Sequence, residues 1–215
     1  MRFLRRESRP AKAWVFAEEI LSAATFAECE RLAELARGVR VLEIGAYYGR
    51  STIAMASRAT VVHSIDPHQG GPPERPDTLQ SFLENLETHG VRDKVVVHVG
   101  PSTAIAPLFN PETFDMAFVD AMHQRPDVDI DLALASRCLR PGGWLALHDY
   151  GTEGVYVADE WHPFGVTEAV AEFVQLVGCD APEVLDSLAV LRVPTDAKRL
   201  AAWRDGTDRF VTIPQ

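Results

Sequence analysis

The sequence lacks paired cysteines, long apolar segments and an excess of positive charge, and each absence argues against a class of protein. Its three cysteines, Cys29, Cys138 and Cys179, include no C-x-x-C pair, so we expect reduced core thiols in a cytoplasmic protein. No apolar run approaches the length that spans a bilayer, so we expect a soluble chain without a membrane partner. The formal net charge of −10 argues against a nucleic-acid partner, because such proteins depend on clustered Lys and Arg.

The chain also lacks internal repeats, low-complexity segments and a signal-type apolar core. Its 215 residues suit one domain with a single substantial core. We divide it into an N-terminal arm with helices that can form a lid (residues 1–38), a central domain (39–193) and a C-terminal tail (194–215) that the sequence does not place. We expect the arm, Met1 to Arg9, to be mobile.

A strand, a glycine turn and a helix follow one another between Val41 and Ala59. The strand is apolar apart from Glu43, which is typical of a parallel strand buried on both faces. Gly45 and Gly49 bracket the turn, and the helix that follows leaves backbone N–H groups free to meet a ligand. The pattern predicts a nucleotide-binding corner.

The spacing of the turn indicates which nucleotide it binds. In the dinucleotide motif G-x-G-x-x-G the middle glycine lets the backbone approach a pyrophosphate, whereas here Tyr47 stands near that position. The Glu43 carboxylate would repel phosphate but can pair with a ligand ammonium. S-adenosylmethionine carries an ammonium, a sulfonium and no phosphate, so the residues favour it over NAD, and a dinucleotide oxidoreductase is the weaker alternative.

Further motifs follow in a fixed order along the chain. They are Glu43-Ile44-Gly45, Ile65-Asp66-Pro67, Val119-Asp120-Ala121-Met122-His123, Leu139-Arg140-Pro141-Gly142-Gly143 and His148-Asp149-Tyr150. With them the chain resembles class I S-adenosylmethionine-dependent methyltransferases, and more narrowly the small-molecule O-methyltransferase-like group of the methyltransferase family 24 type. The resemblance implies a Rossmann-like α/β fold: a central seven-stranded, mostly parallel sheet with a terminal antiparallel hairpin and helices on both faces.

Alternating apolar and helical patterns predict the elements of this fold. A capping box at Thr25 and Glu28 begins a helix whose apolar face includes Phe26, and this helix can be a lid or a cover of the sheet. The expected strands are 60–65, 95–99, 114–119, 144–147 and a hairpin of 182–185 and 188–193. Helices are expected at 79–86, 103–108, 127–139 and 166–177, and a loop at 151–163.

We expect the cofactor site at the carboxyl ends of the first strands. Asp66, at the end of the second strand, can accept both hydrogen bonds of a ribose diol. The resemblance implies that Ser102 lies beside the adenine ring, although Ser102 can instead cap the next helix. The complete predicted cofactor set is Glu43, Gly45, Tyr47, Gly49, Ser51, Asp66, Ser102 and Asp120.

Two neighbouring strand ends bring together Asp120, His123, His148 and Asp149. In one interpretation Asp120 and Asp149 hold a divalent cation such as magnesium, which gathers substrate oxygens and lowers their pKa. The chain departs from the metal-dependent relatives at Met122 and His148, and both departures remove hard oxygen ligands. We therefore favour the second interpretation, in which His123 or His148 is a general base near Asp120 and no metal is needed.

Each residue also has a purely structural alternative: Asp120 can cap a turn, Asp131 can hold His123, and His148 can be a satisfied strand-end histidine. The aromatic residues Tyr47, Tyr48, Trp161 and His162 are candidates for an acceptor pocket.

We therefore predict an S-adenosylmethionine-dependent enzyme that methylates a small-molecule hydroxyl, in a specialised metabolite or a sugar. The alternatives are a non-methylating enzyme on the same fold, such as a cyclase, and a non-enzymatic cofactor-binding regulator. A homo-oligomer stays open, because the apolar stripe of the N-terminal helix can be a dimer face or a core face.

Overall fold

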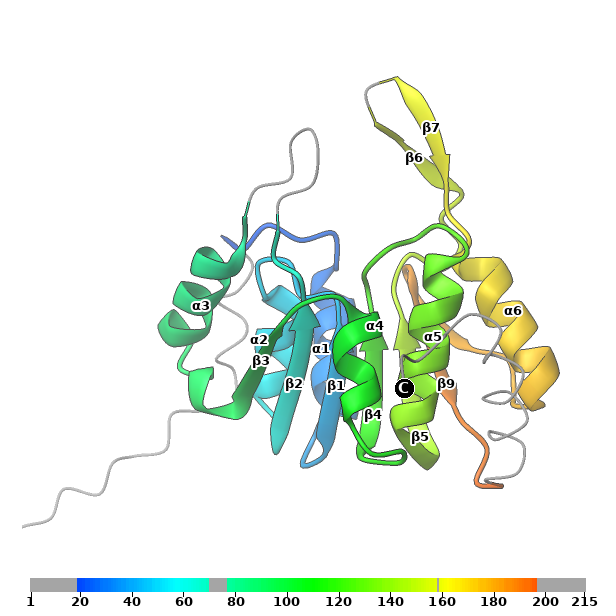
Figure 1. Cartoon of the computed structure of the whole chain (residues 1–215), viewed down its shortest axis with the longest axis horizontal. Helices are drawn as coiled ribbons and strands as arrows, with labels where there is room; N and C mark the ends of the chain where they lie inside the picture. Colours follow the sequence, from blue (N-terminus) through cyan, green and yellow to red (C-terminus); the bar gives the residue numbers. More distant parts are fainter. Residues whose placement is uncertain (1–18, 70–76, 158, 197–215) are drawn as a thin grey trace, which may run out of the picture.

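The computed structural model describes residues 19–69, 77–157 and 159–196, and its centre is a seven-stranded sheet of order β3-β2-β1-β4-β5-β9-β8 (Figure 1). The strands are β1 Arg40–Ile44, β2 Val61–Asp66, β3 Val95–Val99, β4 Phe114–Val119, β5 Leu139–Leu147, β8 Glu183–Leu185 and β9 Leu188–Arg192. β1 to β5 are parallel, while β9 runs antiparallel to β5 and to β8. The predicted mostly parallel sheet with a terminal hairpin is confirmed.

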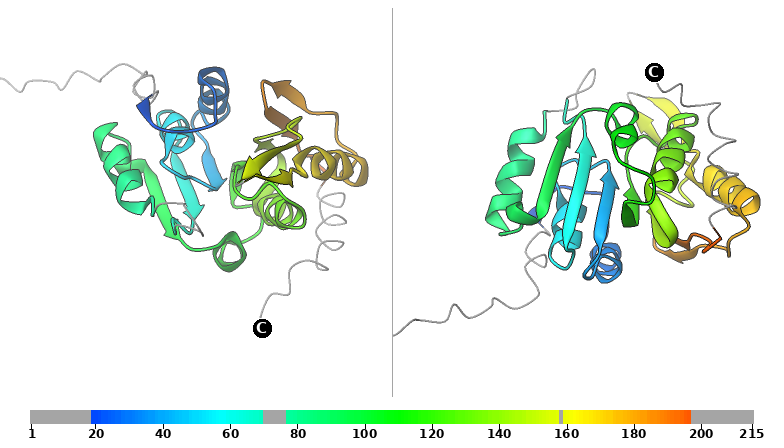
Figure 2. Two further views of the ribbon diagram at one scale, coloured as in Figure 1. Left: turned by 90° about the horizontal axis from the view of Figure 1, so that it is seen from above. Right: turned by 60° about the horizontal axis from the view of Figure 1, so that its bottom comes forward.

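Helices cover both faces of the sheet (Figure 2). One face carries α1 Phe26–Leu35, α2 Arg50–Ala56 and α3 Leu79–Thr88, and the other carries α4 Ser102–Ile105, α5 Asp127–Cys138 and α6 Val166–Val177. Single 3-10 turns lie at Arg92–Lys94 (η2) and Ala106–Leu108 (η3). Side chains alternate between the faces along β1, so Val41 joins one apolar core while Leu42 and Ile44 join the other. None of the helices in the described ranges is both long and apolar enough to cross a membrane.

The capping box of α1 forms as predicted. The Thr25 hydroxyl accepts from the Glu28 N–H at 3.2 Å, and the Glu28 carboxylate accepts from the Thr25 N–H at 2.7 Å. Phe26 is 43% exposed, so its predicted place on the buried face was wrong. The core of α1 is instead built from Cys29, Leu32 and Ala33.

The predicted loop at 151–163 was also wrong, because strands β6 Gly154–Val157 and β7 Glu160–Pro163 pair with each other as a second, separate hairpin. This hairpin projects beyond the end of the main sheet (Figure 1). Strand β5 begins at Leu139 rather than Trp144, because Leu139 already pairs with Phe114 ahead of an irregularity in the ladder. The expected arm, most of the tail and residues 70–76 of a Gly- and Pro-rich loop lie outside the described residues.

Gly45 gives a test of the turn after β1. A Cβ atom there would lie 1.9 Å from the Asp120 carbonyl oxygen, at a φ of +89°. We expect Gly45→Ala to lower the free energy of unfolding by about 3 kcal/mol or more. Gly38→Ala is the matched control, because Gly38 also has a positive φ but no atom within 4 Å of the added Cβ, and its cost should be about 1 kcal/mol. Equal losses in chemical denaturation would contradict this account.

Candidate active site

Asp66 organises the glycine turn at the carboxyl end of the sheet. One carboxylate oxygen accepts from the N–H groups of Ala46 (2.7 Å) and Tyr47 (2.9 Å), and the other accepts from the His68 N–H at 2.6 Å. Tyr47 has a φ of +51°, a conformation that these hydrogen bonds help to hold. Because each carboxylate oxygen has two lone pairs, Asp66 keeps acceptor capacity for a ligand.

Glu43 lies beneath this turn and not beside it. It is fully buried, and its carboxylate accepts hydrogen bonds from the hydroxyls of Ser51 (2.7 Å), Thr52 (2.6 Å) and Ser64 (2.8 Å). Burial raises the pKa of Glu43 to about 7, although the three hydroxyls oppose the rise. The expectation that Glu43 pairs with a ligand ammonium is therefore corrected: this carboxylate joins β1, β2 and α2 below the site.

Ser102 donates a hydrogen bond to the buried Asp131. Its alternative role as a helix cap is not realised, because Pro101 occupies the N-cap position of α4. Asp131 accepts this hydrogen bond from Ser102, while the carboxylates beside His123 are those of Asp120 and Asp149. The structural alternative in which Asp131 holds His123 is therefore corrected.

A cavity of about 830 Å³ opens at this end of the sheet. Its walls include every predicted cofactor residue except Glu43, namely Gly45, Tyr47, Gly49, Ser51, Asp66, Ser102 and Asp120. Tyr48 also lines it, whereas Trp161 and His162 do not, and the hairpin contributes Val155 in their place. The acceptor-pocket prediction is therefore corrected for the two hairpin residues.

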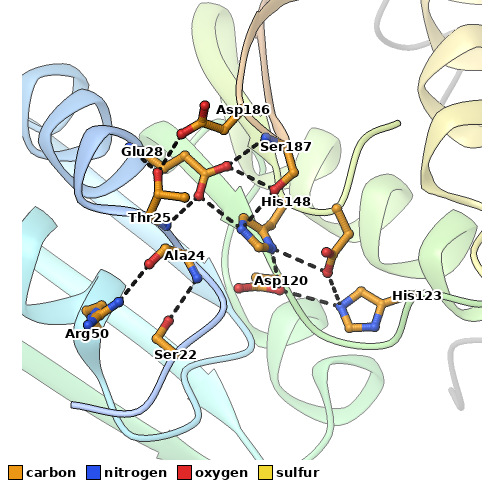
Figure 3. A network of polar contacts seen from close by, with 11 residues as sticks. Ser22, Ala24, Thr25, Glu28, Arg50, Asp120, His123, His148, Asp186 and Ser187 are labelled. Atoms are coloured by element: carbon orange, nitrogen blue, oxygen red, sulfur yellow. Dashed lines mark hydrogen bonds and ion pairs between the residues drawn. The ribbon is translucent and has the colours of Figure 1, made fainter. Parts of the chain in front are cut away.

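Three residues of the predicted four-residue cluster, Asp120, His123 and Asp149, line the cavity. Figure 3 shows the side chains of Asp120 and His123 next to each other. The Nε2 atom of His123 lies 2.9 Å from Asp149 Oδ2 and 3.5 Å from Asp120 Oδ1. Asp120 follows β4 and Asp149 follows β5, so the two parallel strands deliver them to the same edge. Asp149 has a φ of +60°, an uncommon backbone conformation for a non-glycine residue.

His148 is separated from the cavity and only 2% exposed, which corrects its assignment as a candidate base. Its Nδ1 atom lies 3.3 Å from Asp149 Oδ2 and 3.6 Å from Asp120 Oδ1, distances of ion pairs without hydrogen-bond geometry. Its Nε2 atom lies 3.2 Å from Glu28 Oε2 and 3.2 Å from the Ser187 hydroxyl (Figure 3).

Glu28 is the residue that the sequence patterns missed. The capping box indicated only its local contact with Thr25. Its fully buried carboxylate also accepts from the backbone N–H (2.8 Å) and the hydroxyl (2.9 Å) of Ser187 and contacts His148. No local signal could reveal partners that lie 120 and 159 residues away.

Charges of opposite sign alternate through this cluster. Burial opposes every charge, but contacts with Asp149 and Glu28 raise the pKa of His148 to about 10, and contacts with Asp120 and Asp149 raise that of His123 to about 9. Burial alone would raise the pKa of the Glu28 and Asp149 carboxyls. Contacts that include His148 nevertheless lower the pKa of Glu28 to about 2, and the two histidines hold the pKa of Asp149 well below its usual range. The cluster therefore contains anionic carboxylates and cationic imidazoles at neutral pH.

Asp120, His123 and Asp149 can each offer one ligand atom to a cation, all within 4.8 Å of one another. Magnesium prefers oxygen ligands, and here the third ligand is an imidazole that must first lose its proton. His148 already supplies a positive charge beside both carboxylates. This donor set does not fit a magnesium ion.

Strand order, the glycine turn and the acidic residues at the strand ends define the class I methyltransferase fold. A sequence profile described as "Methyltransferase domain", of the family 24 type, matches residues 42–150, just over half of the chain. The chain therefore belongs to this family, and the predicted group of S-adenosylmethionine-dependent, O-methyltransferase-like proteins is confirmed. A sequence search of curated proteins found no significant match.

Solved structures share the fold at low sequence identity. Cofactor-bound Rv0187 from MTB is 26% identical with a TM-score of 0.60, over 84% of this chain and 86% of that one. The O-methyltransferase TomG from Streptomyces achromogenes, in complex with S-adenosylmethionine, is 24% identical with a TM-score of 0.59, over 86% and 87%. An N1-methyltransferase from Burkholderia thailandensis, with 1,6-didemethyltoxoflavin and S-adenosylhomocysteine bound, is 21% identical with a TM-score of 0.57, over 84% and 81%.

Glu28→Gln tests the buried charge pair. We expect it to lower the free energy of unfolding by about 3 kcal/mol, because it removes the anion beside Nε2 of the buried His148 and leaves carboxylates only beside Nδ1. The exposed Glu30→Gln on the same helix is the matched control and should cost less than about 0.5 kcal/mol.

The decrease in the free energy of unfolding caused by Glu28→Gln should also depend on pH. The raised pKa of His148 contributes stability that is complete below 6.5 and is lost as the pH rises through about 10. The lowered pKa of Glu28 contributes stability that is complete above 4.5 and is lost as the pH falls through about 2. In urea denaturation the cost of Glu28→Gln should therefore be largest between pH 4.5 and 6.5 and smaller at pH 10. A cost that is constant with pH would contradict the charged pair.

Proposed function

We propose that this protein transfers the methyl group of S-adenosylmethionine to a hydroxyl oxygen of a small molecule. The observation that carries the proposal is that one cavity contains both the Asp66 corner and the Asp120–His123–Asp149 cluster. The first provides a cofactor site and the second provides a place to hold and deprotonate an acceptor.

The chemistry of the cavity wall supports S-adenosylmethionine as the ligand. The wall includes five aspartates, Asp66, Asp120, Asp127, Asp131 and Asp149, which complement a ligand that carries ammonium and sulfonium cations. Asp66 lies at the end of β2, where an acid can accept hydrogen bonds from a ribose diol. Tyr47 stands in the turn at the place where a pyrophosphate would need a glycine.

The bound cofactor supplies an electrophilic methyl group for an in-line displacement. The protein must then hold the acceptor hydroxyl in line and accept its proton. His123 suits the second task because it lines the cavity, and Asp149 fixes its ring through a contact of 2.9 Å. The stacking of His123 on Phe164, with ring centroids 4.5 Å apart, further restricts the ring. Asp120 and Asp149 stabilise the imidazolium that forms, and no step requires a metal.

Asp66→Asn tests the cofactor site. The change preserves the shape of the side chain but removes the charge that strengthens its hydrogen bonds, so we expect at least a tenfold loss of affinity for S-adenosylmethionine in calorimetric titration. Asp93→Asn is the control, since Asp93 is exposed and outside the cavity wall. Unchanged affinity in Asp66→Asn would contradict the assignment of Asp66 to the cofactor site.

His123→Gln tests the proton acceptor. With the wild type, the rate of methyl transfer from labelled cofactor to small phenols should rise with pH and level off above about 9, because only the neutral imidazole accepts a proton. The variant should be slower by about a hundredfold or more and should lose this rise.

Both measurements are repeated with EDTA, and the wild-type rate should persist. A rate that disappears on chelation and returns with magnesium would show that the donor set is a metal site. A variant that retains the wild-type pH profile would show that His123 is not the base.

A further inference from the structure

The mouth of the cavity carries large apolar side chains that are exposed to solvent. Leu21, Tyr47, Met122 and Val155 all line the cavity, and Met122 and Val155 are each 44% exposed. They come from the segment before α1, the turn after β1, the loop after β4 and the hairpin β6–β7. Exposed apolar groups that converge on one cavity are typical of a ligand site.

The inner wall of the same cavity is negatively charged. Among the described lining residues there are five aspartates and no lysine, and the basic side chains are Arg50, His68 and His123. Burial lowers the pKa of His68, which favours its neutral form. Arg50 donates to the Ala24 carbonyl at 2.8 Å, and His123 lies between two carboxylates. The carboxylate of S-adenosylmethionine is balanced by the ammonium of the same molecule. An acceptor whose phosphate or carboxylate has no such partner would meet more negative than positive groups in this wall.

The hairpin β6–β7 is held against the loop after β4 that carries His123, and these contacts fix the position of Val155. The Gly165 N–H donates to the His123 carbonyl at 2.7 Å, and Phe164 stacks on the His123 ring. The Gln124 amide lies 3.1 Å from Nδ1 of His162, which pairs with Val155 across the hairpin. These contacts fix the hairpin against the loop that carries His123.

Successive side chains of β6 point to opposite faces of the hairpin. Val155 lines the cavity, whereas Tyr156 is outside the cavity wall and packs on Trp161, with ring centroids 4.9 Å apart. The two neighbours therefore offer one cavity position and one control position on a single strand.

We infer that the acceptor is an uncharged molecule with an apolar, ring-sized body that lies against Met122 and Val155, and that Val155 is a specificity-determining residue. The inference rests on the proposed function and deepens it. It disfavours acceptors linked to a nucleotide or bearing a carboxylate, and it favours a neutral phenol whose hydroxyl meets His123.

The test is a matched pair of probes that differ in one charge, methyl 3,4-dihydroxybenzoate and 3,4-dihydroxybenzoate. Each is titrated at pH 7 into the protein saturated with S-adenosylhomocysteine, and the heat of binding is measured. We expect the ester to bind at least about tenfold more tightly than the acid, because the acid brings an anion to an acidic wall. Equal affinities, tighter binding of the acid, or no binding of either probe would overturn the inference.

Two variants test the role of the hairpin. Val155→Lys should reduce the preference for the ester by about fivefold, since it places a cation beside the carboxylate of the acid. Tyr156→Lys adds the same charge on the opposite face of the strand and should leave the preference unchanged. A preference that shifts equally in both variants, or in neither, would overturn the assignment of Val155.

The same experiments distinguish a failure of the proposed function from a failure of the inference about the ligand. If the ester binds with the expected preference but accepts no labelled methyl group, the proposed function fails while the inference about the ligand holds. If S-adenosylhomocysteine does not bind, the proposed function fails, and the two probes are titrated into the free protein with the same deciding outcomes.

Discussion

The buried carboxylate of Glu28 is the contact on which the arrangement of the site depends. It joins helix α1, the end of β5 and the turn between β8 and β9, three segments that are distant in the sequence. A fully buried anion needs a cation or several donors, and His148 and Ser187 provide both. Helix α1 is therefore anchored in the core, while the residues just before it, Leu21 to Ala23, line the cavity.

Glu28 also affects the charges at the carboxyl edge of the sheet. Glu28 favours the cationic form of His148, and that cation lies beside Asp120 and Asp149. Two carboxylates close together repel each other, and repulsion would spread them or protonate one of them. His148 on one side and His123 on the other offset this repulsion, and they hold the pKa of Asp149 well below its usual range. The side chains of this cluster thus place two imidazole rings beside the carboxylates of Asp120 and Asp149.

The features that the sequence predicted are those with local causes. The β1–turn–α2 unit, the capping box at Thr25 and the terminal hairpin follow from spacing within a few residues. Asp66 and Asp120 could be placed because parallel strands bring their carboxyl ends to one edge. The roles of Glu43 and His148 could not, since burial depends on which helices cover the strand ends. The β6–β7 hairpin was missed because its strands are short and their side chains largely exposed, so they follow no core pattern.

The difference between locally determined features and features that depend on distant segments explains why the fold indicates the cofactor more directly than the acceptor. The cofactor corner consists of backbone N–H groups, glycines and one strand-end acid, all held by the sheet. The acceptor side that we propose includes Leu21, Met122 and Val155, which lie on three separate segments and contribute little to the core. Residues of this kind can change without loss of folding, because surface substitutions usually alter stability by only about 0.5 kcal/mol. The O-methyltransferase TomG and the N1-methyltransferase share the fold of this chain at 24% and 21% sequence identity. Such a result is expected when the residues that hold the fold are separate from those at the mouth of the cavity.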